Sequence, residues 1–199
     1  LDEVVNGMMA CETKPVVPIG YIPAGTTNDF AASVGIPSDM TEAALIAANG
    51  IPKCIDIGLF RGRENRKISE EHFVYVAAFG LFTETSYETP QDLKNMLGHS
   101  AYILQGLQEL AKLQTYHVRV ETDELTLADA FAFGMISNSK SVGGFANITG
   151  DYVDMTDGLF EVTLVKMPTN LLELGEIIQY FNRVIDASDF VYRFKTSRS

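Results

Sequence analysis

The sequence is poor in the residues that build zinc sites and disulfides. It has only two cysteines, Cys11 and Cys54, and three histidines, and neither residue type has the spacing of a zinc site. Two widely separated cysteines favour a reduced, intracellular protein. A nucleophile elbow with its catalytic triad is also missing. The sequence therefore does not favour a zinc enzyme or a hydrolase with a catalytic triad.

Long apolar runs and basic residues are also scarce. No run is long enough to cross a membrane and no signal peptide opens the chain, so a cytoplasmic protein is expected. Lysine and arginine number 15 against 26 acidic residues, a net charge of −11. Nucleic-acid binding requires clustered basic residues, so no nucleic-acid partner is expected. Strong binding to an anionic membrane through overall charge is disfavoured for the same reason.

The first fifty residues alternate between helical and strand patterns. Helices are predicted over about 2–9, 29–34 and 43–49, and an apolar strand over 16–22. Hydrophobic residues make up 46% of the 199 residues, enough for one domain or two small ones. Helices that alternate with a strand indicate part of a parallel sheet with helices on its faces.

From residue 53 onward the pattern is dominated by strands. Strands are predicted over 54–60, 73–80, 116–121, 124–127, 130–137, 159–165 and 190–195, helices over 97–113 and 171–185, and a polar hairpin loop over 61–71. The predicted class is therefore α+β: an α/β region over residues 1–53, followed by a β-rich, sandwich-like domain with inserted helices over residues 54–199.

A small-residue turn joins the predicted strand 16–22 to the next helix. Gly25 allows a ligand to approach the backbone, and the Thr26 hydroxyl can donate to a phosphate oxygen. Asp29 would repel a phosphate unless a cation such as Mg²⁺ lay between them. The alternative is an ordinary helix cap, for which Asn28 and Asp29 are both suited. On residue chemistry alone, the cap is the stronger interpretation.

Two further acidic positions are candidates for chemistry. Asp56 lies alone in an apolar segment, so it is paired, binds a metal, faces a cleft, or lies on a solvated strand face. Asp151, Asp154 and Asp157 precede the strand 159–165, and such turns offer carboxylate and carbonyl oxygens to hard cations. The alternative there is a plain Asp-Gly turn. An EF-hand does not fit, because Glu161 falls too early for its last ligand position.

A glycine- and serine-rich loop over 137–145 follows the most apolar predicted strand. Such a loop either lines an active cleft or only needs to be flexible.

Taken in order, these pieces resemble the diacylglycerol kinase catalytic-domain superfamily, which includes soluble bacterial lipid kinases and the sphingosine and ceramide kinases. The resemblance covers nearly the whole chain, and the ordered set is more specific than any one motif. The matching stretches are Asp2-Glu3-Val4-Val5-Asn6-Gly7, Ile22-Pro23-Ala24-Gly25-Thr26-Thr27-Asn28-Asp29-Phe30-Ala31, Asp56-Ile57-Gly58, Tyr75-Val76-Ala77-Ala78-Phe79-Gly80, Leu97-Gly98-His99-Ser100-Ala101-Tyr102, Ile136-Ser137-Asn138-Ser139 with Gly143-Gly144-Phe145, and Asp157-Gly158-Leu159-Phe160.

The resemblance implies a lipid kinase that uses ATP and Mg²⁺ to convert diacylglycerol to phosphatidic acid. By the same resemblance Gly25, Thr26 and Asn28 bind the nucleotide, and Asp29 and Asp56 are active-site carboxylates. A kinase for another lipid alcohol, of the sphingosine or ceramide type, is the alternative within the enzyme class. A non-catalytic binding module with the same fold is the alternative outside it.

The resemblance also implies a structural Mg²⁺ site at the turn before the strand 159–165. Asp157 would supply its carboxylate, and Asp154 and Leu159 their backbone carbonyls. The superfamily's Gly-Gly-Asp-Gly-Thr loop and its late catalytic glutamate are not found in this sequence. The expectation is an internal fragment that is inactive by itself. By the resemblance, residues 1–53 are the remnant of an α/β nucleotide-binding domain, and the β-rich domain over residues 54–199 is incomplete at its C-terminus. Transient contact with the inner face of the membrane and a possible homodimer are also expected.

Overall fold

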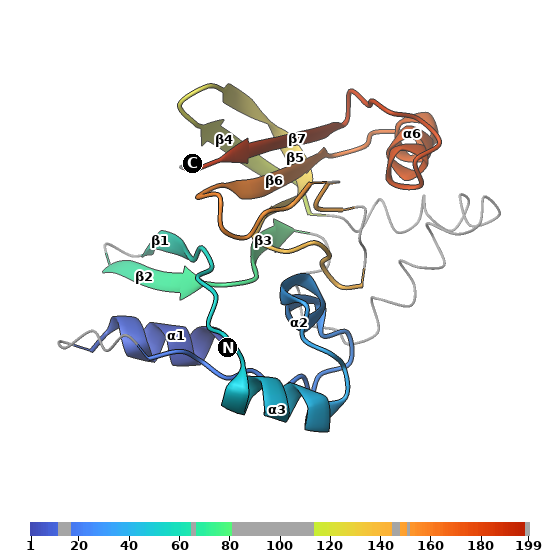
Figure 1. Ribbon diagram of the computed structural model, residues 1–199. Coiled ribbons are helices and arrows are strands. Elements are labelled where there is room, and N and C mark those ends of the chain that lie inside the picture. The colour runs from blue at the N-terminus through green and yellow to red at the C-terminus, as the bar shows by residue number, and fades with distance from the viewer. Residues whose placement is uncertain (12–16, 65–66, 81–113, 145–147, 151, 198–199) are drawn as a thin grey trace. The chain divides into compact units, whose positions relative to one another are not determined.

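The computed structural model describes residues 1–11, 17–64, 67–80, 114–144, 148–150 and 152–197 (Figure 1). Their contacts divide the chain into two compact units. The first comprises residues 1–77 and 137–160, and the second comprises residues 78–136 and 161–199. Each unit is therefore discontinuous in sequence. The domain boundary predicted between residues 53 and 54 stays a prediction.

Among its described residues, the first unit has three helices: α1 (Asp2–Met9), α2 (Asp29–Val34) and α3 (Met40–Asn49). All three were predicted, but α3 begins at Met40 rather than at residue 43. The cause is Asp39, whose side chain accepts a hydrogen bond from the Glu42 N–H at 2.9 Å and caps the helix. α2 ends at Gly35, whose φ of 80° is a left-handed conformation that glycine adopts without strain.

A hairpin forms the strand part of the first unit. β1 (Gly58–Glu64) and β2 (Lys67–Phe73) pair antiparallel from Gly58↔Phe73 to Glu64↔Lys67. The prediction of a loop over 61–71 is therefore wrong for the described residues. An isolated two-stranded ribbon leaves much of its surface in water, so its strands carry polar side chains, including the Arg61–Glu70 pair at 2.6 Å.

Helix α1 packs against β2 (Figure 1). The Asn6 side-chain amide donates to the His72 carbonyl at 2.7 Å, and its oxygen accepts from the His72 N–H at 2.7 Å. Asp2 in the same helix accepts from the Val74 N–H at 3.0 Å. These contacts satisfy backbone groups at the end of the hairpin and tie it to the helix.

The predicted strand over 16–22 is wrong, because residues 17–22 are not in a strand. Val17, Ile19 and Ile22 are 58%, 41% and 46% exposed. β-Branched residues favour strands, but a strand also requires a neighbouring strand that completes its backbone hydrogen bonds. Among the described residues no strand pairs with this segment, and the expected parallel sheet is not found there.

The second unit is built on a five-stranded sheet. The strands β3 (Val76–Gly80), β5 (Thr126–Ser137), β6 (Phe160–Lys166) and β7 (Val191–Thr196) lie in that order, and β4 (Tyr116–Glu121) pairs antiparallel with β5. The strands predicted over 124–127 and 130–137 are therefore one strand. Phe131, Val162 and Leu164 form the buried centre. The predicted helix over 97–113 lies outside the described residues, and the α+β class is confirmed.

Helix α6 (Leu171–Phe181) is attached to the sheet through a cation–π contact. The Arg193 guanidinium of β7 lies 4.9 Å from the centre of the Tyr180 ring. The predicted helix over 171–185 ends earlier, at Phe181. Asn170 caps its start, since its side chain accepts from the Leu172 and Glu173 N–H groups at 2.9 and 3.1 Å. No described helix is both long and apolar enough to span a bilayer.

Replacing Asn170 by alanine is expected to lower the free energy of unfolding by about 1 kcal/mol, the usual cost of losing an N-cap. Urea unfolding followed by circular dichroism measures this change. Gln179→Ala is the matched control, because Gln179 is an exposed residue inside the same helix, where alanine is tolerated. Equal unfolding midpoints for the two variants would contradict the assigned cap.

Candidate functional site

The turn before α2 is closed by Asn28. The Asn28 side-chain oxygen accepts from the Gly25 N–H at 2.9 Å, and its amide donates to the Gly25 carbonyl at 2.7 Å. Asn28 itself has φ of 52°, a left-handed conformation that asparagine tolerates better than most residues. Both polar ends of the Asn28 side chain therefore shape the turn. Thr26, the predicted nucleotide contact, lies exposed within it.

Asp29 is buried, with 6% of its surface exposed. Its Oδ2 accepts a hydrogen bond from the Tyr75 hydroxyl at 2.9 Å, and its Oδ1 accepts one from the Ser141 hydroxyl. The Gly144 N–H lies 3.1 Å from Oδ2 and 3.3 Å from Oδ1. A buried carboxylate requires such donors, because burial without them is costly. We call Asp29 and these three donors the Asp29 cluster.

The loop that supplies two of these donors follows β5. The Lys140 N–H donates to the Ser33 hydroxyl of α2 at 3.0 Å, and the Ser33 and Ser139 hydroxyl oxygens lie 2.8 Å apart. Gly143 and Gly144 have φ of 62° and 81°, so two successive residues adopt the conformation that favours glycine. The predicted glycine- and serine-rich loop is thus held against α2 over its described residues.

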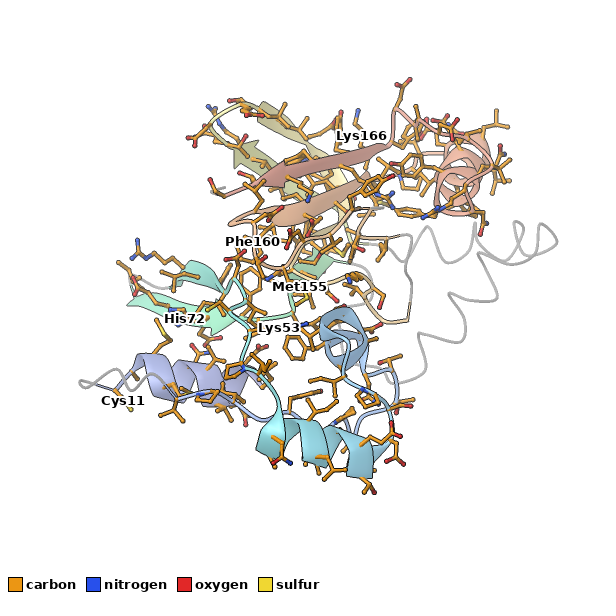
Figure 2. The ribbon with its side chains drawn as sticks, viewed as in Figure 1. Cys11, Lys53, His72, Met155, Phe160 and Lys166 are labelled. Atoms are coloured by element: carbon orange, nitrogen blue, oxygen red, sulfur yellow. The ribbon has the colours of Figure 1, made fainter. Side chains whose placement is uncertain are left out.

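Asp56 precedes β1, which begins at Gly58, so the strand predicted to contain Asp56 starts later. Its Oδ2 accepts from the Gly158 N–H at 2.7 Å, and its own N–H donates to the Met155 carbonyl at 2.8 Å. Met155 lies in the segment before β6 (Figure 2). Within the described residues, Oδ1 of Asp56 accepts no hydrogen bond. One carboxylate oxygen of Asp56 therefore holds the turn that contains Gly158.

The turn over 154–159 is closed by its own carboxylates. Asp154 Oδ1 accepts from the Thr156 N–H at 3.0 Å and from its hydroxyl at 2.8 Å. Asp157 Oδ1 accepts from the Leu159 N–H at 3.0 Å. Across the described part of the chain, no three His, Cys, Asp or Glu side chains converge as a metal site. The predicted ligand set has one carboxylate and two carbonyls, and these donor types suit Mg²⁺.

Asn138 connects the two predicted catalytic aspartates. Its N–H donates to the Tyr75 carbonyl at 3.0 Å, and its side-chain amide donates to the Asp56 carbonyl at 2.8 Å. Asn138 and its neighbours Ser137 and Ser139 are fully buried. The end of β5 therefore contacts both the residue that bonds to Asp29 and the backbone of Asp56. Within the described part of the chain, by contrast, the Asn28 side chain bonds only to its near neighbour Gly25.

The sequence signalled only part of this site. The loop over 137–145 was identified by its composition, whereas Tyr75 and Ser33 were not identified as partners of Asp29 and of the loop. Tyr75 lies 46 positions from Asp29, and no local pattern connects residues so far apart. Burial is the main cause that raises the pKa of the Tyr75 phenol above its usual range, and the Asp29 carboxylate adds to the rise. The phenol therefore stays protonated and acts as a donor to Asp29.

The chain is similar to one known protein family and to several known proteins. The family model for the diacylglycerol kinase catalytic domain matches residues 1–60. The diacylglycerol kinase of Bacillus subtilis strain 168 is 36% identical over 174 residues, which cover 87% of this chain and 54% of that protein. A diacylglycerol kinase of Staphylococcus epidermidis is 33% identical over 183 residues, or 92% of this chain and 54% of that protein. The chain thus spans about half the length of these curated relatives.

Solved structures match the same fold. A crystal structure of a diacylglycerol kinase from Bacillus anthracis strain Sterne superposes with a TM-score of 0.56 and is 25% identical, covering 96% of this chain and 60% of that one. Another crystal structure from the same organism gives a TM-score of 0.60 at 24% identity, covering 98% of this chain and 61% of that one. The second likeness concerns the fold alone.

Proposed function

We propose that this chain belongs to the diacylglycerol kinase catalytic-domain superfamily, and that the protein in its full length is an ATP-dependent lipid kinase that converts diacylglycerol to phosphatidic acid. The observation that carries the proposal is the 36% identity over 174 residues to a diacylglycerol kinase. We also propose a peripheral, transient contact with the membrane that holds the lipid substrate.

The reaction transfers one phosphoryl group. The lipid hydroxyl oxygen forms a bond to the γ-phosphorus of ATP while the bond from that phosphorus to the bridging oxygen breaks, and ADP leaves. The hydroxyl proton passes to a base. Mg²⁺, when bound, neutralises charge on the phosphate oxygens. The task of the protein is mainly to position the reactants and to supply electrostatic stabilisation.

The candidate residues suit different parts of this task. Thr26 is exposed in a turn whose backbone Asn28 holds closed at Gly25, and we propose that this turn contacts the nucleotide. Asp56 has one carboxylate oxygen in a hydrogen bond with the Gly158 N–H. We propose that its other oxygen acts toward the phosphates and their Mg²⁺.

The buried aspartate and the acidic turn have supporting tasks in this proposal. Asp29 is surrounded by hydrogen-bond donors, which supports an electrostatic and organising role close to the reaction. Asp157, with the carbonyls of Asp154 and Leu159, would hold a structural Mg²⁺ in the turn before β6. These assignments rest on the superfamily resemblance and on the donor types present.

A lipid panel tests the proposed function. The full-length protein is incubated with radiolabelled ATP and Mg²⁺ and with diacylglycerol, sphingosine or ceramide in mixed micelles. We expect labelled phosphatidic acid, and Asp56→Asn should lower its rate of formation by about 100-fold. Label in a sphingoid product instead would establish the other lipid-kinase class. Label in none of the lipids would favour a non-catalytic binding module.

A further inference from the structure

Tyr75 is fixed at both its backbone and its hydroxyl. It lies in the short connection between β2 and β3, and its carbonyl accepts from the Asn138 N–H at 3.0 Å. Its phenol oxygen lies 2.9 Å from Asp29 Oδ2 and 3.0 Å from the Gly143 nitrogen. A half-buried tyrosine with such contacts is held in one orientation, and its hydroxyl bridges α2 and the loop after β5.

The direction of these hydrogen bonds follows from the donors. The Gly143 N–H can only donate, so the phenol oxygen accepts that bond and its single hydrogen is given to Asp29. A carboxylate that accepts from a hydroxyl makes a stronger bond than a neutral pair does. Tyr75 is therefore a donor to the buried carboxylate, and it cannot serve as the base that receives the lipid proton while it holds this bond.

Tyr75 differs from the other donors in the Asp29 cluster. Ser141 and Gly144 both belong to the loop after β5, so both bind Asp29 from one segment. Tyr75 comes from a different segment, the connection between β2 and β3, and it binds both the Asp29 carboxylate and the loop. Without the Tyr75 hydroxyl, Asp29 Oδ2 would keep only the Gly144 N–H as a donor, and the Gly143 N–H would lose its acceptor.

We propose that Tyr75 is a positioning residue, whose hydroxyl fixes the orientation of the Asp29 carboxylate and of the loop over 139–144. Only the expected effect of Tyr75 on kcat rests on the proposed kinase function. The geometric part concerns contacts within the first unit and holds for any reaction that uses Asp29.

Tyr75→Phe in the full-length protein tests the inference, because it removes the hydroxyl and keeps the ring. Hydrogen exchange of the Gly143 and Gly144 amides should become about tenfold faster, since the Gly143 N–H loses its acceptor. The kcat for diacylglycerol should fall about tenfold, while the KM for ATP stays within about twofold. Tyr180→Phe, the same change in the second unit, should leave exchange and kcat as in the wild type.

A double variant separates positioning from a merely structural role. If Tyr75 acts through Asp29, then adding Tyr75→Phe to Asp29→Asn should lower kcat no further. Independent, multiplying losses would overturn the inference. Wild-type exchange at Gly143 in Tyr75→Phe would overturn it as well, and so would wild-type kcat. If the wild-type protein phosphorylates no lipid, the proposed function fails, and the exchange measurement alone decides whether Tyr75 positions the loop.

Discussion

Asp29→Asn is expected to lower kcat for diacylglycerol by about 100-fold or more, the usual cost of losing a preorganised electrostatic group. The side chain keeps its size, but its Nδ2 is a donor and not an acceptor. In the Asp29 cluster this amide would face the Tyr75 hydroxyl, the Ser141 hydroxyl or the Gly144 N–H, all of which are donors. Whichever way the amide turns, one donor of the cluster loses its acceptor.

The same substitution is expected to lower the free energy of unfolding by about 1–3 kcal/mol, the cost of a buried unsatisfied polar group. Steady-state kinetics and urea unfolding measure the two effects separately. Asp39→Asn is the matched control, because Asp39 caps α3 in the same unit and asparagine caps a helix as well as aspartate does. Wild-type kcat and stability in Asp29→Asn would contradict the role of the Asp29 cluster.

Gly80→Ala is expected to destabilise the second unit by about 3 kcal/mol or more. Gly80 ends β3 with φ of 87°, where a side chain costs about 1–2 kcal/mol by itself. A Cβ atom at Gly80 would also lie 2.3 Å from the Ala132 carbonyl oxygen and 3.1 Å from the Phe133 Cα. Both are backbone atoms of β5, so they can move only if the sheet is distorted.

Thermal and urea unfolding measure the effect of Gly80→Ala, with Gly175→Ala as its control. Gly175 lies inside α6, and an added Cβ there meets nothing within 4 Å. Alanine should therefore stabilise that helix by about 0.5–1 kcal/mol. The two glycine substitutions are thus expected to change stability in opposite directions. A destabilisation of Gly80→Ala no larger than that of an ordinary surface substitution would contradict the close packing of β3 on β5.

Elements with strong local signals were predicted well. The helices α1 and α2 and the strand β4 lie where their patterns placed them, because caps, apolar periodicity and alternation are properties of neighbouring residues. The prediction failed for the segment over 17–22 and for the β1–β2 hairpin. Whether a segment is a strand depends on its pairing with another strand. An apolar segment without a partner stays irregular, and a polar one with a partner becomes a strand.

The candidate site divides in the same way. The sequence by itself determined the chemical types: the turn at Gly25, the carboxylates Asp29 and Asp56, the acidic turn before β6 and the loop after β5. Only the tertiary structure decided their partners. Asp29 bonds to Tyr75 and Gly144, which lie 46 and 115 positions away, and Asp56 bonds to Gly158, 102 positions away. Hydrogen bonds over such separations depend on how the elements pack, because no local pattern encodes them.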